Sequence, residues 1–286
     1  MHYKTSVPAK INLWLEVIGK RADGYHELSS LMLPIGVYDH IELEFGGGGS
    51  ISLQCDRPEI PADARNLAWR AAASYFDAAG IETGVHIRLR KNIPAGAGLG
   101  GGSADGGAVL LAMNRVFDCR LPMDRLEKLA LKLGADVPFF LRQQPALATG
   151  IGEKLQPVHG LPPYPLVLIK PPLTVSTAWV YQSLKLTRDR SHIKLARILT
   201  DPWRLEDAIR NDLETVTLTE YPLVAEIKNW LLHQGAVAAL MSGSGPTVFG
   251  VFRDTGQAEG VASRARQRWD QCWVAKTEVL TSSADS

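Results

Sequence analysis

A glycine-rich segment, residues 94–105, holds the residue types that best suit a phosphate-binding loop. It reads Pro-Ala-Gly-Ala-Gly-Leu-Gly-Gly-Gly-Ser-Ala-Asp. Glycine lets backbone N–H groups turn toward an anion with no side chain in the way. The Ala- and Leu-rich stretch that follows predicts a helix that opens near Ser103, and its N-terminus adds free N–H groups and the positive end of the helix dipole. The segment therefore predicts a site for a phosphate chain, whereas the second glycine run, Gly46–Gly49, is interpreted as a flexible turn.

The spacing of these glycines matches neither of the common nucleotide loops well. Gly96, Gly98 and Gly101 satisfy G-x-G-x-x-G, which is a weak signal alone and should follow a buried apolar strand. The preceding segment, Val85–Arg90, instead alternates apolar and polar residues. A Walker A loop would end in Gly-Lys-Ser/Thr, and no lysine is present here. A nicotinamide-dependent oxidoreductase, with Asp118 as the ribose acid, stays an alternative that this strand and Pro94 disfavour.

Composition excludes several classes of partner. The chain has 286 residues and 31 basic against 30 acidic side chains, a net charge of +1, so it lacks the electrostatic footprint of a nucleic-acid or membrane-surface protein. No apolar run approaches a membrane span and the first residues lack a signal-peptide core, so we expect a cytoplasmic protein. Three distant cysteines, Cys55, Cys119 and Cys272, disfavour a disulfide framework or a zinc site.

The elements that must position the loop suggest two domains, residues 1–158 and 159–286, joined near a proline- and glycine-rich stretch at 156–165. The first half mixes strands and helices. We expect a strand with Ile11, Leu13, Leu15 and Val17 on one face, a hairpin of 38–45 with 51–55, a helix over 66–79 stopped by Gly80, a strand at 85–90, the loop helix to about 117, and a helix capped by Asp124 that ends at 134.

The second half predicts a β-α-β-β-α-β order, which is typical of a ferredoxin-like domain. Its expected strands cover 166–170, 236–241, 247–252 and 273–280, and its expected helices cover 177–186, 205–218, 223–233 and 257–269. A tight Ser-Gly-Ser-Gly-Pro turn lies at 242–246, and the polar tail 281–286 is expected to be disordered.

Three separated segments resemble the three motifs of the galactokinase, homoserine, mevalonate and phosphomevalonate kinase superfamily. They are Pro-Ala-Lys-Ile-Asn-Leu at 8–13, the loop at 94–105, and Ser-Gly-Ser-Gly-Pro-Thr at 242–247. Two further segments resemble one branch of this superfamily closely. They are Gly-Lys-Arg-Ala-Asp-Gly-Tyr-His-Glu at 19–27 and Gly-Ala-Asp-Val-Pro-Phe-Phe at 134–140. The resemblance implies an α+β fold in which a domain like the second domain of ribosomal protein S5 precedes a ferredoxin-like domain, with the active site in the cleft between them.

Members of that branch transfer the γ-phosphoryl group of ATP to the 2-hydroxyl of 4-diphosphocytidyl-2-C-methyl-D-erythritol, in the non-mevalonate pathway to isoprenoid precursors. The resemblance implies that Asp136 is the catalytic base and Lys10 the second catalytic residue. An alcohol that attacks phosphorus must lose its proton, and an ammonium stabilises the developing alkoxide. A capping or salt-bridging acid and a solvated lysine are the structural alternatives. Because Lys10 and Asn12 lie opposite the apolar face of their strand, a shared site suits them.

The remaining assignments follow the matched motifs. Tyr25 offers a stacking face and His26 a donor and an acceptor to a cytosine ring, while Tyr181 matches the second aromatic of a base sandwich, with ordinary packing as its alternative. Asn66 matches a residue near the adenine, and its alternative role is a helix N-cap. The ATP-binding set is Pro94, Ala95, Gly96, Ala97, Gly98, Leu99, Gly100, Gly101, Gly102, Ser103, Ala104 and Asn66. The substrate-binding set is Asn12, Tyr25, His26, Tyr181, Ser242, Gly243, Ser244 and Gly245.

The chain departs from the family pattern at one position that bears on the binding of Mg²⁺. Many relatives carry Ser-Ser after the glycines, whereas this chain has Ser103-Ala104. We therefore assign no protein metal ligand and expect Mg²⁺ to arrive with ATP, held by phosphates and waters. The expected partners are small molecules, with no nucleic acid or membrane, and the oligomeric state stays open. The alternatives are a homoserine or mevalonate kinase, or a non-catalytic nucleotide-binding regulator.

Overall fold

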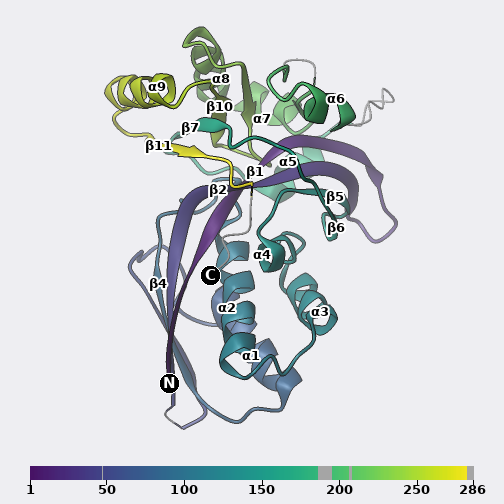
Figure 1. Ribbon diagram of the computed structural model, residues 1–286, viewed down its shortest axis with the longest axis vertical. Helices are drawn as coiled ribbons and strands as arrows, with labels where there is room; N and C mark the ends of the chain where they lie inside the picture. The colour runs from purple at the N-terminus through teal and green to yellow at the C-terminus, as the bar shows by residue number, and fades with distance from the viewer. Residues whose placement is uncertain (47, 186–194, 206–207, 282–286) are drawn as a thin grey trace. The chain divides into compact units, whose positions relative to one another are not determined.

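The computed structural model describes residues 1–46, 48–185, 195–205 and 208–281 (Figure 1). The chain forms two compact units that interleave along the sequence. Unit 1 comprises Met1–Ala9, Val37–Ala95 and Gly100–Gln143, and unit 2 comprises Lys10–Gly36, Gly96–Leu99 and Gln144–Ser286. Two long neighbouring strands, β1 (His2–Lys20) and β2 (His26–Phe45), therefore contribute residues to both units. The domain boundary at 158/159 stays a prediction.

The sheet of unit 1 contains a strand pairing that the sequence did not suggest. β2 pairs antiparallel with β4 (Val85–Arg90), and β4 pairs parallel with β3 (Ile51–Cys55). The expected hairpin of 38–45 with 51–55 is therefore wrong, because β4 lies between those two strands. The glycine run at 46–49 has the composition of a turn, but turn composition alone does not decide which strands pair. β4 buries Val85, Ile87 and Leu89, and this apolar face fits the inner position.

Helices α1 (Leu67–Ala79) and α2 (Gly101–Val116) pack against each other in unit 1, with α3 (Met123–Leu133) and α4 (Phe139–Arg142) beside them (Figure 1). The predicted limits of α1 are confirmed, because the Asn66 side chain accepts the N–H of Ala68 and Gly80 adopts a left-handed φ of 60°. The predicted cap of α3 is wrong. Pro122 holds the N-cap position, and Asp124 lies in the first turn with its carboxylate 3.5 Å from the Lys128 ammonium.

Unit 2 contains a four-stranded antiparallel sheet in the order β11-β7-β10-β9. Its strands are β7 (Pro165–Lys170), β9 (Ala238–Met241), β10 (Val248–Val251) and β11 (Trp273–Glu278). The long helices α8 (Pro222–His233) and α9 (Thr255–Arg268) pack on this sheet and complete the predicted β-α-β-β-α-β order. The shared core includes Val167, Ile169, Ile227, Leu231, Val248, Val261 and Ala265.

The region 205–218, which the sequence predicted as one helix, contains a short strand followed by the start of a shorter helix. Arg210–Asn211 forms the short strand β8, which pairs parallel with β1 at Trp14 and Leu15, and α7 (Glu214–Glu220) begins only afterwards. The Asn211 side chain accepts the Leu213 N–H, and such a local bond competes with helix formation.

The other elements of unit 2 are shorter. They are β5 (Ala146–Gly150), β6 (Lys154–Pro157), α5 (Thr177–Ser183) and α6 (Leu195–Thr200). β6 takes the start of the stretch expected to be a linker, and Leu161 and Tyr164 in the rest of it are buried. The predicted end of the helix at 186 and most of the expected tail, 282–286, lie outside the described residues. Within the part of the chain that the structure describes, none of the helices has the length and apolar character of a bilayer span.

The contact between α2 and α4 generates a test of this packing. A Cβ atom at Gly107 would lie 2.7 Å from the Phe140 Cβ and 3.2 Å from the Val137 carbonyl oxygen. We expect Gly107→Ala to lower the free energy of unfolding by about 1–3 kcal/mol, because neither neighbour can move without a backbone shift. Gly102→Ala is the matched control, since its nearest neighbour is the Leu67 Cδ1 at 3.8 Å. Equal denaturation midpoints for the two variants would contradict this packing.

Candidate active site

The glycine loop adopts a backbone that only glycine accepts readily. Gly96, Gly98 and Gly100 have φ of 59°, 75° and 76°, in the left-handed region where other residues are strained. α2 opens at Gly101, two residues before the predicted start, and no side chain caps it. The first N–H groups of an uncapped helix remain available to an anion. Gly96–Leu99 belongs to unit 2, whereas Pro94, Ala95 and Gly100–Ala104 belong to unit 1.

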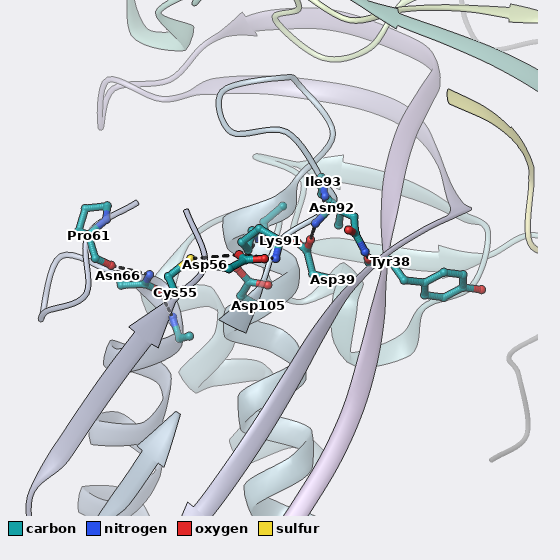
Figure 2. A network of polar contacts seen from close by, with 12 residues as sticks. Tyr38, Asp39, Cys55, Asp56, Pro61, Asn66, Lys91, Asn92, Ile93 and Asp105 are labelled. Atoms are coloured by element: carbon teal, nitrogen blue, oxygen red, sulfur yellow. Dashed lines mark hydrogen bonds and ion pairs between the residues drawn. The ribbon is translucent and has the colours of Figure 1, made fainter. Parts of the chain in front are cut away.

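A buried charge cluster underlies the unit 1 part of the loop (Figure 2). The Lys91 ammonium contacts the Asp39 carboxylate, lies 2.5 Å from the Asp105 Oδ2 and donates to the Gly101 carbonyl at 3.4 Å. Asp39 also accepts the N–H groups of Asn92 and Ile93, at 2.7 and 2.9 Å. The cluster therefore ties the chain that leaves β4 to the first turns of α2.

The cluster has two carboxylates for one ammonium. Burial lowers the pKa of Lys91, but its two carboxylate neighbours outweigh burial and raise it. Burial raises the pKa of Asp105 to about 7, with Lys91 opposing the change and Asp39 adding to it. Within the described residues, the Asp105 Oδ1 is also a buried atom without a hydrogen-bond partner. Asp105 is therefore the member whose ionisation costs the fold most.

Lys10 and Asn12 lie together in unit 2, as their spacing on β1 predicts. The Lys10 ammonium donates to the Asn12 Oδ1 at 2.7 Å, and the Asn12 amide donates to the Ser30 hydroxyl at 2.8 Å. The Ser30 hydroxyl in turn donates to the Trp14 carbonyl at 2.7 Å. All three polar side chains are buried. This chain of bonds fixes the orientation of the Asn12 amide and thereby the position of the ammonium beside it.

The Ser-Gly-Ser-Gly turn brings a distant segment to the same place. The Ser242 hydroxyl donates to the Gly98 carbonyl at 2.9 Å, and a Cβ atom at Gly98 would lie only 2.1 Å from the Ser242 carbonyl oxygen. Gly243 has a φ of 56°, and a Cβ there would lie 3.5 Å from both the Lys10 Nζ and the Asn12 Oδ1. Parts of all three sequence motifs therefore meet in unit 2.

Two of the three residues expected to bind the base, His26 and Tyr181, lie against each other. The His26 and Tyr181 rings lie with centroids 5.1 Å apart and planes inclined by 30°. Burial, with Lys20 adding to it, lowers the pKa of His26 and favours its neutral form. α5, which carries Tyr181, is linked to the turn by a 2.8 Å hydrogen bond between Thr177 and Ser244. Tyr25 has 59% of its surface exposed, next to this pair in the sequence.

The remaining expected residues lie in unit 1. Asp136 lies between α3 and α4, in a short segment that also holds the buried Val137. Asn66 caps α1 and donates to the Pro61 carbonyl at 2.8 Å (Figure 2), so its structural alternative is confirmed, whereas a role near adenine stays a prediction. Among the described residues, no group of three or more His, Cys, Asp or Glu side chains could hold a metal ion.

Sequence reasoning missed one polar residue next to the turn. Asn211 is buried and donates to the carbonyls of Met241 and Gly243. A helix was expected across this position, although Asn and Asp in succession are poor helix-interior residues. That composition was the available signal.

Two family models match the chain in order. The model of the GHMP kinase N-terminal domain matches residues 66–144, and that of the GHMP kinase C-terminal region matches residues 183–271. The chain is 50% identical over 261 residues to the 4-diphosphocytidyl-2-C-methyl-D-erythritol kinase of Syntrophotalea carbinolica, covering 91% of this chain and 93% of that enzyme. It is 45% identical over 255 residues to the enzyme of the same name from Geobacter metallireducens, covering 89% and 91%.

The chain also matches solved structures of kinases. A 4-(cytidine 5'-diphospho)-2C-methyl-D-erythritol kinase is 37% identical and matches with a TM-score of 0.82 over 96% of this chain and 99% of that one. A homoserine kinase from Cytophaga hutchinsonii matches with a TM-score of 0.78 over 98% and 95%, at 18% identity. The second likeness shows a common fold alone.

The charge cluster yields a prediction about pH. A carboxyl whose pKa is higher in the folded than in the unfolded state favours folding through its proton, and this contribution is lost as pH rises from about 4 to about 7. Asp105→Asn removes the titration while keeping the shape. We therefore expect the variant to gain roughly 1–3 kcal/mol of unfolding free energy over the parent between pH 5 and pH 8, measured by urea denaturation.

Asp63→Asn is the control for this prediction. Asp63 is an exposed carboxylate whose pKa the Arg65 hydrogen bond lowers to about 2, so it does not titrate between pH 5 and pH 8. Parallel stability curves for the parent and Asp105→Asn would mean that Asp105 is ionised throughout that range.

Proposed function

The chain belongs to the GHMP kinase family, and we propose that it transfers the γ-phosphoryl group of ATP to the 2-hydroxyl of 4-diphosphocytidyl-2-C-methyl-D-erythritol. The family resemblance drawn from the three motifs is confirmed by both domain models and by relatives that span nearly the whole chain. The chain is an ATP-dependent small-molecule kinase of isoprenoid precursor synthesis. Unit 2 supports this assignment most directly, because Lys10, Gly98 and Gly243 meet there.

In the proposed reaction the acceptor hydroxyl loses its proton to the Asp136 carboxylate. Its oxygen forms a bond to the γ-phosphorus, the bond from that phosphorus to the β,γ-bridging oxygen breaks, and ADP leaves. Phosphoryl transfer depends mainly on positioning and on neutralising charge. The Lys10 ammonium, oriented by Asn12, supplies positive charge to the oxygen that becomes anionic. The uncapped start of α2 supplies N–H groups to the ATP phosphates.

Ser103 and Ala104, which follow the glycines, are compatible with Mg²⁺ that arrives bound to ATP. Ser103 offers one partly exposed hydroxyl in the first turn of α2, whereas the next residue, Ala104, is a buried methyl group. A single hydroxyl can complete the octahedral oxygen shell of Mg²⁺ but cannot build it. Mg²⁺ bound to ATP would neutralise phosphate charge, held by phosphates and waters, and no protein ligand is assigned to it.

The fold assignments can be refined in the same way. We assign the sheet of β7, β9, β10 and β11 to the ferredoxin-like class, because its antiparallel order and its two covering helices follow the β-α-β-β-α-β scheme. The N-terminal domain is assigned to the class of the second domain of ribosomal protein S5, on the motif resemblance.

The direct test of the function is an ADP-release assay with three acceptors in parallel. We expect turnover with 4-diphosphocytidyl-2-C-methyl-D-erythritol and little with mevalonate or homoserine, and ³¹P spectroscopy of the product should place the new phosphate on the 2-oxygen. Preference for mevalonate or homoserine would replace the substrate assignment, and tight ATP binding with no turnover would favour a non-catalytic regulator.

Asp136→Asn tests the base. The amide keeps the shape of the side chain but cannot take a proton, so we expect kcat to fall by roughly two to four orders of magnitude while the KM for ATP changes little. Asp124→Asn is the control, an exposed carboxylate on the neighbouring helix α3. Similar kcat values in both variants would remove Asp136 from the mechanism.

His26→Ala and Tyr181→Ala test the aromatic pair. Stacking a base on an aromatic ring contributes about 1–3 kcal/mol, so each change should weaken acceptor binding by roughly five- to a hundredfold while ATP affinity holds. Tyr25→Ala shows whether the exposed ring also stacks on the base. Variants that lose ATP affinity and keep acceptor affinity would assign these rings to the adenine site.

A further inference from the structure

The segment Asn211-Asp212-Leu213-Glu214 holds the Ser242–Gly245 turn from behind. The Asn211 amide donates to the carbonyls of Met241 at 2.8 Å and Gly243 at 2.7 Å. The Glu214 carboxylate accepts the Met241 N–H at 2.8 Å and pairs with Lys228. Asp212 accepts the Val17 N–H at 2.8 Å. One short segment is thus bonded both to β1, the strand of Lys10, and to the turn.

The amide of Asn211 has only one satisfactory orientation. Both of its hydrogens are used by the two carbonyls, and its oxygen accepts the Leu213 N–H at 3.0 Å. The side chain is 4% exposed, so water cannot replace a lost partner easily. A rotated amide would place its oxygen against two carbonyl oxygens, which is repulsive.

The bond to the Gly243 carbonyl orients a peptide group of the turn. In a planar trans peptide the C=O and the following N–H point in opposite directions. The Ser244 N–H therefore points away from Asn211. Within the described residues, the N–H groups of Gly243 and Ser244 donate to no acceptor in the protein. Gly243 also lies beside the Lys10 ammonium, so these two donors lie where positive charge is already present.

The neighbours of the turn indicate which substrate these donors face. The Ser244 hydroxyl bonds to Thr177, the first residue of α5, and α5 carries Tyr181, which packs on His26. A ligand whose base reaches that aromatic pair would bring its own phosphates toward the turn. A diphosphate attached to a cytidine has this geometry of a base at one end and anionic oxygens beside it.

We propose that Asn211 is a positioning residue that holds the Gly243–Ser244 peptide so that the Ser244 N–H, together with the neighbouring Gly243 N–H, binds the diphosphate of the acceptor substrate. The inference rests on the proposed function and deepens it, because it assigns the diphosphate subsite to backbone donors. Asn211 itself does not contact the substrate.

Asn211→Asp is the sharpest variant. A carboxylate keeps the acceptor for Leu213 but replaces the amide donor by an anionic oxygen, so the 243–244 peptide is expected to rotate and give its N–H to residue 211. A backbone hydrogen bond to a charged group contributes enough for a loss of about ten- to a hundredfold in affinity. We expect that loss in the KM for the acceptor, with the KM for ATP within about threefold of the parent value.

Equilibrium binding separates positioning from general damage. The probes are cytidine and cytidine 5'-diphosphate, measured by calorimetry on the full chain. The parent should bind the diphosphate more tightly than the nucleoside, and Asn211→Asp should reduce this ratio. A change that only loosened the fold would weaken both probes alike and leave the ratio unchanged, which would overturn the proposal.

Two further variants serve as a fallback and a control for the role of Asn211. Asn211→Ser retains one donor and should show an intermediate ratio if Asn211→Asp fails to fold. Glu214→Gln keeps the acceptor for the Met241 N–H and loses only the charge pair with Lys228, so its ratio should equal that of the parent. A parent that binds both probes equally overturns the diphosphate subsite, whereas a parent that shows the ratio but no turnover contradicts the proposed function alone.

Discussion

Two backbone segments 144 residues apart in the sequence touch at Gly98 and Ser242, and the geometry of the site in unit 2 depends on this contact. The approach is so close that a Cβ atom at Gly98 would lie 2.1 Å from the Ser242 carbonyl oxygen. No other residue fits, because φ there is also left-handed. Glycine at this position therefore permits close packing as well as an unobstructed path to phosphate. The next glycine contact, Gly243 beside Lys10, follows from the same approach.

Two buried lysines, Lys10 in unit 2 and Lys91 in unit 1, make different hydrogen bonds and ion pairs. In unit 2, the Lys10 ammonium donates to the Asn12 Oδ1, and the Asn12 amide is itself fixed by the Ser30 hydroxyl. In unit 1, Lys91 lies between two carboxylates and is neutralised within the protein. Its role is to anchor the start of α2 beneath the loop.

Sequence patterns within a few residues predicted much of the fold. They failed where the structure depends on contacts between segments far apart in the chain. The limits of α1 could be predicted because Asn66 and Gly80 act through bonds within a few residues. The pairing of β3 with β4 could not, because parallel partners are joined by a long crossover and the glycines at 46–49 specify no partner. The three motifs identified most of the candidate residues that meet in unit 2. Asn211 was missed because its two carbonyl partners lie 30 and 32 residues away.

The interleaving of the two units has a consequence for synthesis on the ribosome. The chain passes between the units after Ala9, Gly36, Ala95, Leu99 and Gln143. Every residue of unit 1 exists once Gln143 has been made, whereas the sheet of unit 2 lacks β11 until Glu278 emerges. All residues of unit 1 are therefore present while Lys10–Gly36 and Gly96–Leu99, which belong to unit 2, still lack partners that come later in the chain. No single cut of the polypeptide releases either unit whole, so neither unit can be produced alone as one continuous segment of this chain.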